Sequence, residues 1–259
     1  MQLNLRLNPE VVAVVLAIVF AALTAAGGLA MFTGAEAGPG LVREFTRVFD
    51  LDREGNLPAL IQAMTLLTCG ILLAFVAAVA RQKRELGARR WAVLSGIFMY
   101  LAIDEGAGIH ELSGFVVRHF VQPQGFFRFS WVIVALIFLV FFVLAYARFT
   151  FRLPPATRLR FITAGILYVG GAVGMEMIAG RYIAATRAWN SPIYFGLAMG
   201  EEALEMAGMT LMLFAILAHL RDHVPLTTLK LIWLSRSHSS GRPAPLGAPE
   251  DRVASRAVR

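Results

Sequence analysis

Charged residues and cysteine are both scarce in this sequence. Only 16% of its 259 residues are charged, whereas 58% are hydrophobic, a composition typical of a multipass membrane protein and not of a soluble domain. The single cysteine, Cys69, lies inside an apolar run, which excludes a disulfide framework and leaves the redox compartment open. The sequence also lacks a Gly-rich phosphate loop, a paired-cysteine zinc motif and a G-x-S-x-G nucleophile motif.

Long apolar runs, in contrast, recur along the chain. Each is long enough to cross about 30 Å of hydrocarbon, and together they predict an all-α polytopic membrane protein with a bundle of six transmembrane helices. The transmembrane domain is expected to cover residues 1–225, with an outer loop at 33–56, and residues 226–259 are expected to form a disordered basic tail. The six segments fall approximately at residues 11–32, 57–80, 91–117, 129–147, 161–180 and 194–220.

The positive charges predict how the chain crosses the membrane. Of the 24 Lys and Arg residues, 17 fall before the first segment, in the 81–90 and 148–160 loops and in the tail. By the positive-inside rule, both termini should therefore be cytoplasmic. The net charge of +7 is thus explained by topology, so we expect membrane lipids as partners and no nucleic acid.

The outer loop contains two features. Apolar residues recur at helical spacing between Leu41 and Phe49, which predicts a short amphipathic helix on the outer membrane surface. The following sequence FDLDREGNLP resembles the start of a calcium loop, but Ile61 stands where a bidentate glutamate is needed. A solvated acidic turn leading into Pro58 is the favoured interpretation.

The third apolar segment carries four ionisable residues, Asp104, Glu105, His110 and Glu111. A carboxylate inside a bilayer costs several kcal/mol unless it is paired, protonated or bound to a cation, so these residues predict a functional site. On a continuous helix, Asp104 and Glu111 would lie within about 20° of each other. Gly106 and Gly108 could permit a local distortion.

The fifth and sixth segments carry the matching acids. Together with the third segment they hold seven of the seventeen acidic residues, and helical rise places most of them roughly 7–10 Å below the outer ends of their helices. The same two segments contain Gly170-x-x-x-Gly174 and Gly196-x-x-x-Gly200, which predict close helix packing. The acids of these two segments are Glu176, Glu201, Glu202 and Glu205.

Several carboxylates and one histidine on packed helices are the ligands of di-iron and di-manganese bundle sites. The Glu-x-x-His spacing of ferritin-like proteins is absent, however. We therefore predict a carboxylate/His centre of one or two divalent ions (iron, manganese or zinc) without ferritin-like ancestry. His110 and Glu202 are the candidates for catalytic proton transfer. The candidate metal ligands are Asp104, Glu105, His110, Glu111, Glu176, Glu201 and Glu205.

Four motifs, DEGAGIHE, GMEMIAG, EEALEMAG and FDLDREGNLP, together resemble a group of uncharacterised six-helix bacterial inner-membrane proteins. The resemblance covers most of residues 41–215. It implies the same architecture and a multipass location in the bacterial inner (plasma) membrane, and it supplies no reaction, substrate or cofactor.

The leading functional hypothesis is a metal-dependent membrane oxidoreductase that acts on a lipid-soluble small molecule in the outer half of the bilayer. The first alternative is a proton or divalent-cation transporter or channel, which needs a polar route to the cytoplasm. Below the acids, the relevant helices offer little for such a route except Ser95, Thr163 and Thr210. The second alternative is an accessory subunit whose acids pair with Arg118, Arg181, a partner membrane protein or a second copy of the chain.

Overall fold

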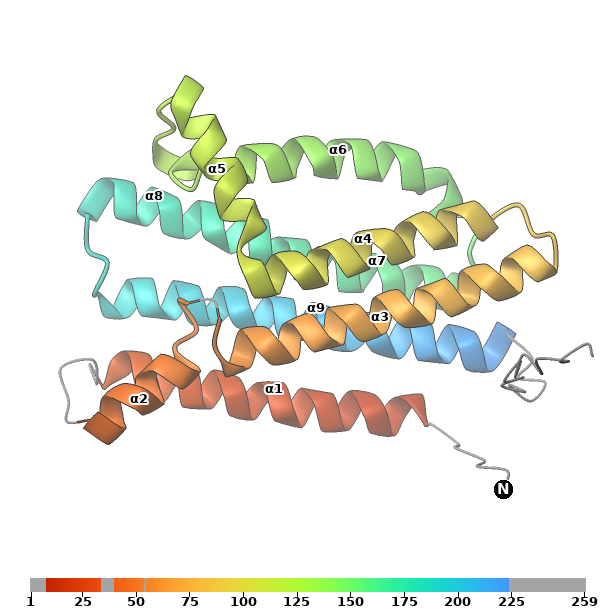
Figure 1. Ribbon diagram of the computed structural model, residues 1–259, viewed down its shortest axis with the longest axis horizontal. Helices are drawn as coiled ribbons and strands as arrows, with labels where there is room; N and C mark the ends of the chain where they lie inside the picture. The colour runs from red at the N-terminus through yellow and green to blue at the C-terminus, as the bar shows by residue number, and fades with distance from the viewer. Residues whose placement is uncertain (1–7, 34–39, 54, 224–259) are drawn as a thin grey trace, which may run out of the picture. The chain divides into compact units, whose positions relative to one another are not determined.

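The computed structural model describes residues 8–33, 40–53 and 55–223 (Figure 1). All of the regular structure in these residues is helical, which confirms the predicted all-α class. Five continuous helices are long and apolar enough to cross a membrane, and a bent pair of helices supplies a sixth candidate span. The chain is therefore a polytopic membrane protein. The predicted basic tail lies outside the described residues.

The N-terminal part contains α1 (Pro9–Phe32), α2 (Gly40–Phe49) and α3 (Leu57–Gln82). The Asn8 side chain accepts a hydrogen bond from the Glu10 N–H and so caps α1, while Asn56 caps α3 in the same way through the Ala59 N–H. The predicted amphipathic helix is present as α2, and Leu41 on it is 87% exposed. Such a helix can place its apolar face in a membrane surface.

The third apolar segment is not one helix. It forms α4 (Ala88–Ala107) and α5 (Ile109–Phe120), whose axes differ in direction by 81° (Figure 1). Gly108 makes the break, because it adopts the left-handed conformation (φ 59°) and its N–H bonds to the Asp104 carbonyl, which ends α4. The continuous helix predicted over residues 91–117 was therefore wrong, although the glycine that permits the distortion was correctly identified.

The C-terminal half begins with the short helix η2 (Gly125–Phe127) and with α6 (Trp131–Thr150). The predicted fifth segment consists of α7 (Pro155–Val169), a π-helical turn η3 (Gly170–Met175) and α8 (Glu176–Thr186), which together form one span. The last helix, α9 (Pro192–His223), is 32 residues long. A π-helical turn contains more residues than an α-helical turn, and such turns are frequent at functional sites.

Helix α9 is the centre of the packing: it contacts α1, α3, α7, η3 and α8. The predicted close packing of the fifth and sixth segments is thus present, but of the four predicted glycines only Gly200 takes part in it, where an added Cβ would lie 3.1 Å from the Met175 Cε. An added Cβ at Gly170, Gly174 or Gly196 would meet no atom within 4 Å. An added Cβ at Gly171 would instead lie 2.7 Å from the Glu201 carbonyl oxygen, so the backbones meet at that residue.

A large apolar cluster fills the half of the bundle that contains the C-terminal end of α9. It includes Leu73 of α3, Trp91 of α4, Phe161 of α7 and Ile216 of α9. All the acidic residues of α4 and most of those of α9 lie beyond this cluster, toward the other ends of these helices; they are Asp104, Glu105, Glu201, Glu202 and Glu205. The core therefore separates these acids from the basic 81–90 and 148–160 loops.

Candidate functional site

Three glutamates on α9 form the base of the acidic site. Glu205 is only 8% exposed and lies against η3, where an added Cβ at Gly171 would come within 2.8 Å of the Glu205 Cγ. Glu201 and Glu202 lie one turn earlier and are half-buried. The π-helical turn is thus in direct contact with the backbone that carries these acids, and residue 171 must be glycine for this approach.

The carboxyl groups of Glu176 and Glu201 lie close enough to hydrogen-bond to each other across the α8–α9 contact. The Trp131 indole Nε1–H also donates to Glu176 Oε1, at 3.2 Å. Two ionised carboxylates have no proton to place between them, so a hydrogen bond between Glu176 and Glu201 would require one shared proton. The predicted convergence of Glu176 and Glu201 is therefore present, as a carboxyl pair with a tryptophan donor.

Asp104 and His110 form a second pair at the α4–α5 break. The His110 backbone N–H donates to Asp104 Oδ1 at 2.7 Å, and His110 Nδ1 lies 3.2 Å from Asp104 Oδ2. The His110 ring also packs against the Trp131 ring, with 4.7 Å between their centroids. His110 is close enough to Glu176 for their charges to interact. The break at Gly108 thus brings this pair to the Glu176–Glu201 pair through Trp131.

Glu202 has a separate partner in Gln62 of α3. Gln62 Nε2 donates to Glu202 Oε2 at 2.6 Å, and the Gln62 side chain is only 1% exposed. Among the described residues, Gln62 Oε1 has no hydrogen-bond partner although it is buried. Glu105 lies within electrostatic range of both Glu202 and Glu205. The acids from α4 and α9 therefore face one another, with a buried free acceptor beside them.

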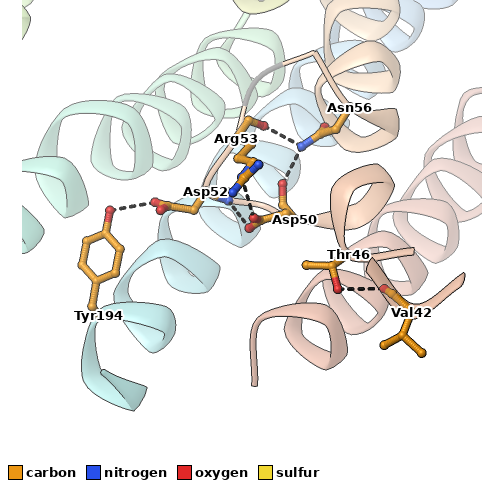
Figure 2. Close-up of polar contacts among 7 residues, drawn as sticks. All are labelled: Val42, Thr46, Asp50, Asp52, Arg53, Asn56 and Tyr194. Carbon is orange, nitrogen blue, oxygen red and sulfur yellow. Dashed lines mark hydrogen bonds and ion pairs between the residues drawn. The ribbon is translucent and has the colours of Figure 1, made fainter. Parts of the chain in front are cut away.

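The turn between α2 and α3 lies over this site. The Tyr194 hydroxyl, at the start of α9, donates to Asp52 Oδ1 at 2.7 Å (Figure 2). Tyr194 is also within electrostatic range of Glu176 and Glu201. Although Asp52 as a residue is exposed, partial burial of its carboxyl group raises its pKa, and the hydrogen bond from Tyr194 opposes that shift. The turn therefore connects the acids to solvent.

The same turn is more ordered than the sequence predicted. The Asn56 side-chain amide donates to the backbone carbonyls of Asp50 and Arg53, and Asp50 Oδ2 lies 3.1 Å from Arg53 Nε (Figure 2). Asp50 and Asn56 are 8% and 9% exposed. The expected solvated acidic turn was therefore wrong for Asp50, because the capping asparagine folds the turn back on itself.

Glu111 does not join the other acids. It is exposed in the first turn of α5, and within the described part of the chain its side chain makes no hydrogen bond or ion pair. Its predicted alignment with Asp104 assumed a continuous helix, whereas the 81° bend at Gly108 lies between them. The prediction that these two residues share one face was wrong for this reason.

The acids do not form a ready metal site. Across residues 8–33, 40–53 and 55–223, no group of three or more His, Cys, Asp or Glu side chains is arranged to hold a metal ion. The acids lie in pairs instead: Asp104 is hydrogen-bonded to His110 and Glu202 to Gln62, and Glu176 lies beside Glu201. In the same ranges, neither Arg118 nor Arg181 forms an ion pair with them; Arg118 donates to Ser130 Oγ.

Three residues of the site were not identified from the sequence: Gln62, Trp131 and Tyr194. Gln62 is the one polar amide in the 57–80 segment, and a lone amide in an apolar span is a signal that could have identified it. Trp131 and Tyr194 each stand at the start of an apolar segment, where aromatic residues are expected simply as interfacial anchors. Their roles depend on contacts between helices, which spacing does not reveal.

Comparison with known proteins places the whole helical region in one family. No curated protein and no solved structure matches the chain. The family model described as Domain of unknown function (DUF8692) matches residues 11–220, which include every helix from α1 to α9 and all the acids of the site. The chain therefore belongs to the family of the domain of unknown function DUF8692.

Proposed function

We propose that this protein is a proton-exchanging membrane protein whose active group is the Glu176–Glu201 carboxyl pair. The observation that carries the proposal is the close approach of these two carboxyl groups, since a hydrogen bond between them needs a proton held between them. Carboxyl and histidine chains inside helical bundles are the usual carriers of protons within membranes. His110 and Glu205, both within electrostatic range of the pair, respond to its charge.

Protons reach the pair from the end of the bundle where α9 begins. The exposed turn at 50–56 supplies Asp52, and Asp52 accepts from Tyr194, which is close to both members of the pair. Toward the other end, the route is closed by the apolar cluster around Leu73, Trp91 and Ile216. We therefore propose that the pair exchanges protons with one side of the membrane only.

The three polar residues that could have lined a route to the cytoplasm, Ser95, Thr163 and Thr210, give no support to such a route. Ser95 Oγ donates to the Gly70 carbonyl oxygen at 2.7 Å, and Thr210 Oγ1 donates to the Met206 carbonyl oxygen at 2.8 Å. Thr163 is exposed on the surface of α7. Because both buried hydroxyls are bonded to backbone, they add no proton path below the acids.

Infrared difference spectroscopy of the purified protein between acidic and alkaline pH tests this proposal. We expect a protonated-carboxyl band that is lost in Glu176→Gln and in Glu201→Gln but kept in Glu111→Gln, the exposed control. In liposomes, we expect no sustained proton flux. A band unaffected by both pair variants would overturn the shared proton, and a robust flux that Glu201→Gln abolishes would overturn the one-sided access.

The side of access can be established independently by cysteine labelling. The native Cys69 is fully buried, so it gives no background. Leu41 and Leu86 are 87% and 97% exposed, at opposite ends of the bundle. By the distribution of basic residues, an impermeant thiol reagent added outside bacterial cells should label Leu41→Cys and not Leu86→Cys. The reverse pattern would place the acids toward the cytoplasm.

A divalent-metal oxidoreductase remains the second candidate, favoured by the number of acids that interact in one region. Glu205 lies within electrostatic range of Glu105, Glu176 and Glu202, and a divalent ion would neutralise several of these charges at once. Metal binding would require side-chain rotation from the observed pairs. Elemental analysis after chelator-free purification separates the candidates: about one or two iron, manganese or zinc atoms per chain, lost in Glu205→Ala, would favour the metal.

A further inference from the structure

A cavity lies at the opposite end of the bundle from the acidic site, and the proposed proton exchange does not use it. It has a volume of about 490 Å³ and is enclosed by the ends of α3, α4, α6 and α9 and by the segment that precedes α7. This volume is within the range of small-ligand pockets, which is roughly 300–1,000 Å³. Its walls combine two kinds of side chain, basic and apolar.

The basic side chains come from three separate elements. Lys83 follows α3, Arg90 belongs to the first turn of α4, and Arg152 follows α6; all three line the cavity. In the part of the chain that the structure describes, none of the three forms an ion pair. Glu85 is the one acidic residue in the lining. The lining therefore carries a net positive charge, because its three basic side chains outnumber Glu85.

The apolar wall is formed by aromatic and aliphatic residues of the bundle core. Trp91 packs edge-on against Phe149, with 4.9 Å between ring centroids, and both rings line the cavity. The buried His219 completes this wall, 5.3 Å from the Trp91 ring and bonded to Thr157. A ligand here would meet positive charge at the rim and apolar rings deeper in the bundle.

We propose that this cavity binds the headgroup of an anionic phospholipid. Its position is the first argument, because the cavity is formed at the ends of helices long enough to cross a membrane, the level at which lipid phosphates lie. Its chemistry is the second, since basic pockets between transmembrane helices bind phosphate-bearing lipid headgroups. Lys83, Arg90 and Arg152 hold the phosphate, and Trp91 and Phe149 contact the glycerol and the first part of the acyl chains.

The test uses the full chain, purified in neutral detergent, with phosphatidylglycerol or phosphatidylcholine added. Phosphatidylglycerol should raise the melting temperature and should remain bound in native mass spectrometry, whereas phosphatidylcholine should do neither. In Arg90→Gln/Arg152→Gln, the apparent affinity for phosphatidylglycerol should fall by about tenfold or more, because two phosphate contacts are lost. Lys83→Gln should weaken binding in the same direction without affecting the fold, because Lys83 is exposed.

Arg89→Gln is the matched control. Arg89 is adjacent to Arg90 and exposed, but it does not line the cavity, so this variant should bind phosphatidylglycerol as the wild type does. If Arg89→Gln weakened phosphatidylglycerol binding as much as the cavity variants do, the binding would reflect general attraction to a basic surface, and the proposal would be overturned. Equal stabilisation by phosphatidylcholine would also overturn it. Competition by free glycerol phosphate or inorganic phosphate at matched concentration would identify a soluble phosphate ligand and reject the lipid.

Discussion

Gly171→Ala is expected to destabilise the folded protein by about 3 kcal/mol, the upper part of the range for overpacking a well-filled core. The added Cβ would lie 2.7 Å from the Glu201 carbonyl oxygen and 3.0 Å from the Glu205 backbone nitrogen. Both atoms belong to the backbone of α9, so no side-chain rotation can relieve the clash. The π-helical turn would have to move away from α9, and the Glu176–Glu201 hydrogen bond would be strained with it.

Gly170→Ala is the control, because it adds the same methyl group at the neighbouring residue. An added Cβ at Gly170 meets no atom within 4 Å, and alanine favours helix over glycine by about 0.5–1 kcal/mol. The thermal unfolding of both variants in one detergent measures the difference. If Gly170→Ala were the damaging substitution and Gly171→Ala were neutral, the packing of η3 against α9 would be wrong.

These two neighbouring glycines show what spacing along a sequence can and cannot predict. The small-residue repeats correctly predicted that the fifth and sixth segments approach each other closely. In the fifth segment they identified the wrong glycines, because the repeat assumes an undistorted α-helix, whereas the turn at Gly170–Met175 is π-helical. A π-helical turn changes the number of residues per turn, so the face that meets α9 rotates away from the repeat. Nothing in the local sequence identifies that turn.

The broken third segment illustrates a different limit. Its apolar composition predicted a membrane span, and the ionisable residues within it led to the prediction of a functional site. At the break, the Asp104 side chain accepts from the His110 backbone N–H of α5 and bonds to the His110 ring. This local hydrogen bonding competes with the continuous helix and is compatible with Gly108 in the left-handed conformation. As a result, His110 is brought to the site and Glu111 is left outside it.

The membrane-facing architecture was more predictable than the site. Hydropathy located the long helices. An apolar segment that crosses a bilayer must satisfy its backbone hydrogen bonds internally, which a helix does. The pairing of polar side chains depends on how the helices rotate and tilt against one another. Gln62 meets Glu202, 140 residues later in the chain, and Tyr194 meets Asp52, 142 residues earlier. Contacts between residues so far apart in the sequence cannot be inferred from the spacing within one helix.

Glu201→Ala is expected to cost about 3 kcal/mol of stability, although it removes one acid from an acidic region. If the acids only repelled one another, removing one of them would stabilise the protein. In the proposed arrangement, Glu201 shares a proton with Glu176, so its loss would leave a cavity and an unsatisfied carboxyl group, losses of roughly this size. Glu201→Gln should stay within about 1 kcal/mol of wild type, since its amide can still bond to Glu176.

A double-mutant cycle makes the distinction quantitative. Because Glu176→Ala and Glu201→Ala each remove the same hydrogen bond, the double variant should cost less than the sum of the two single variants, by about 1–2 kcal/mol. Additive costs would show that the two carboxyl groups do not interact. A melting temperature that rises in Glu201→Ala would favour simple repulsion among the acids. Glu111→Ala, at an exposed residue beyond the bend, should change stability by no more than about 0.5 kcal/mol. The expected stabilities of the two single variants, the double variant and Glu111→Ala follow only if Glu176 and Glu201 stabilise the fold as a pair. They can be measured without knowing any substrate of the protein.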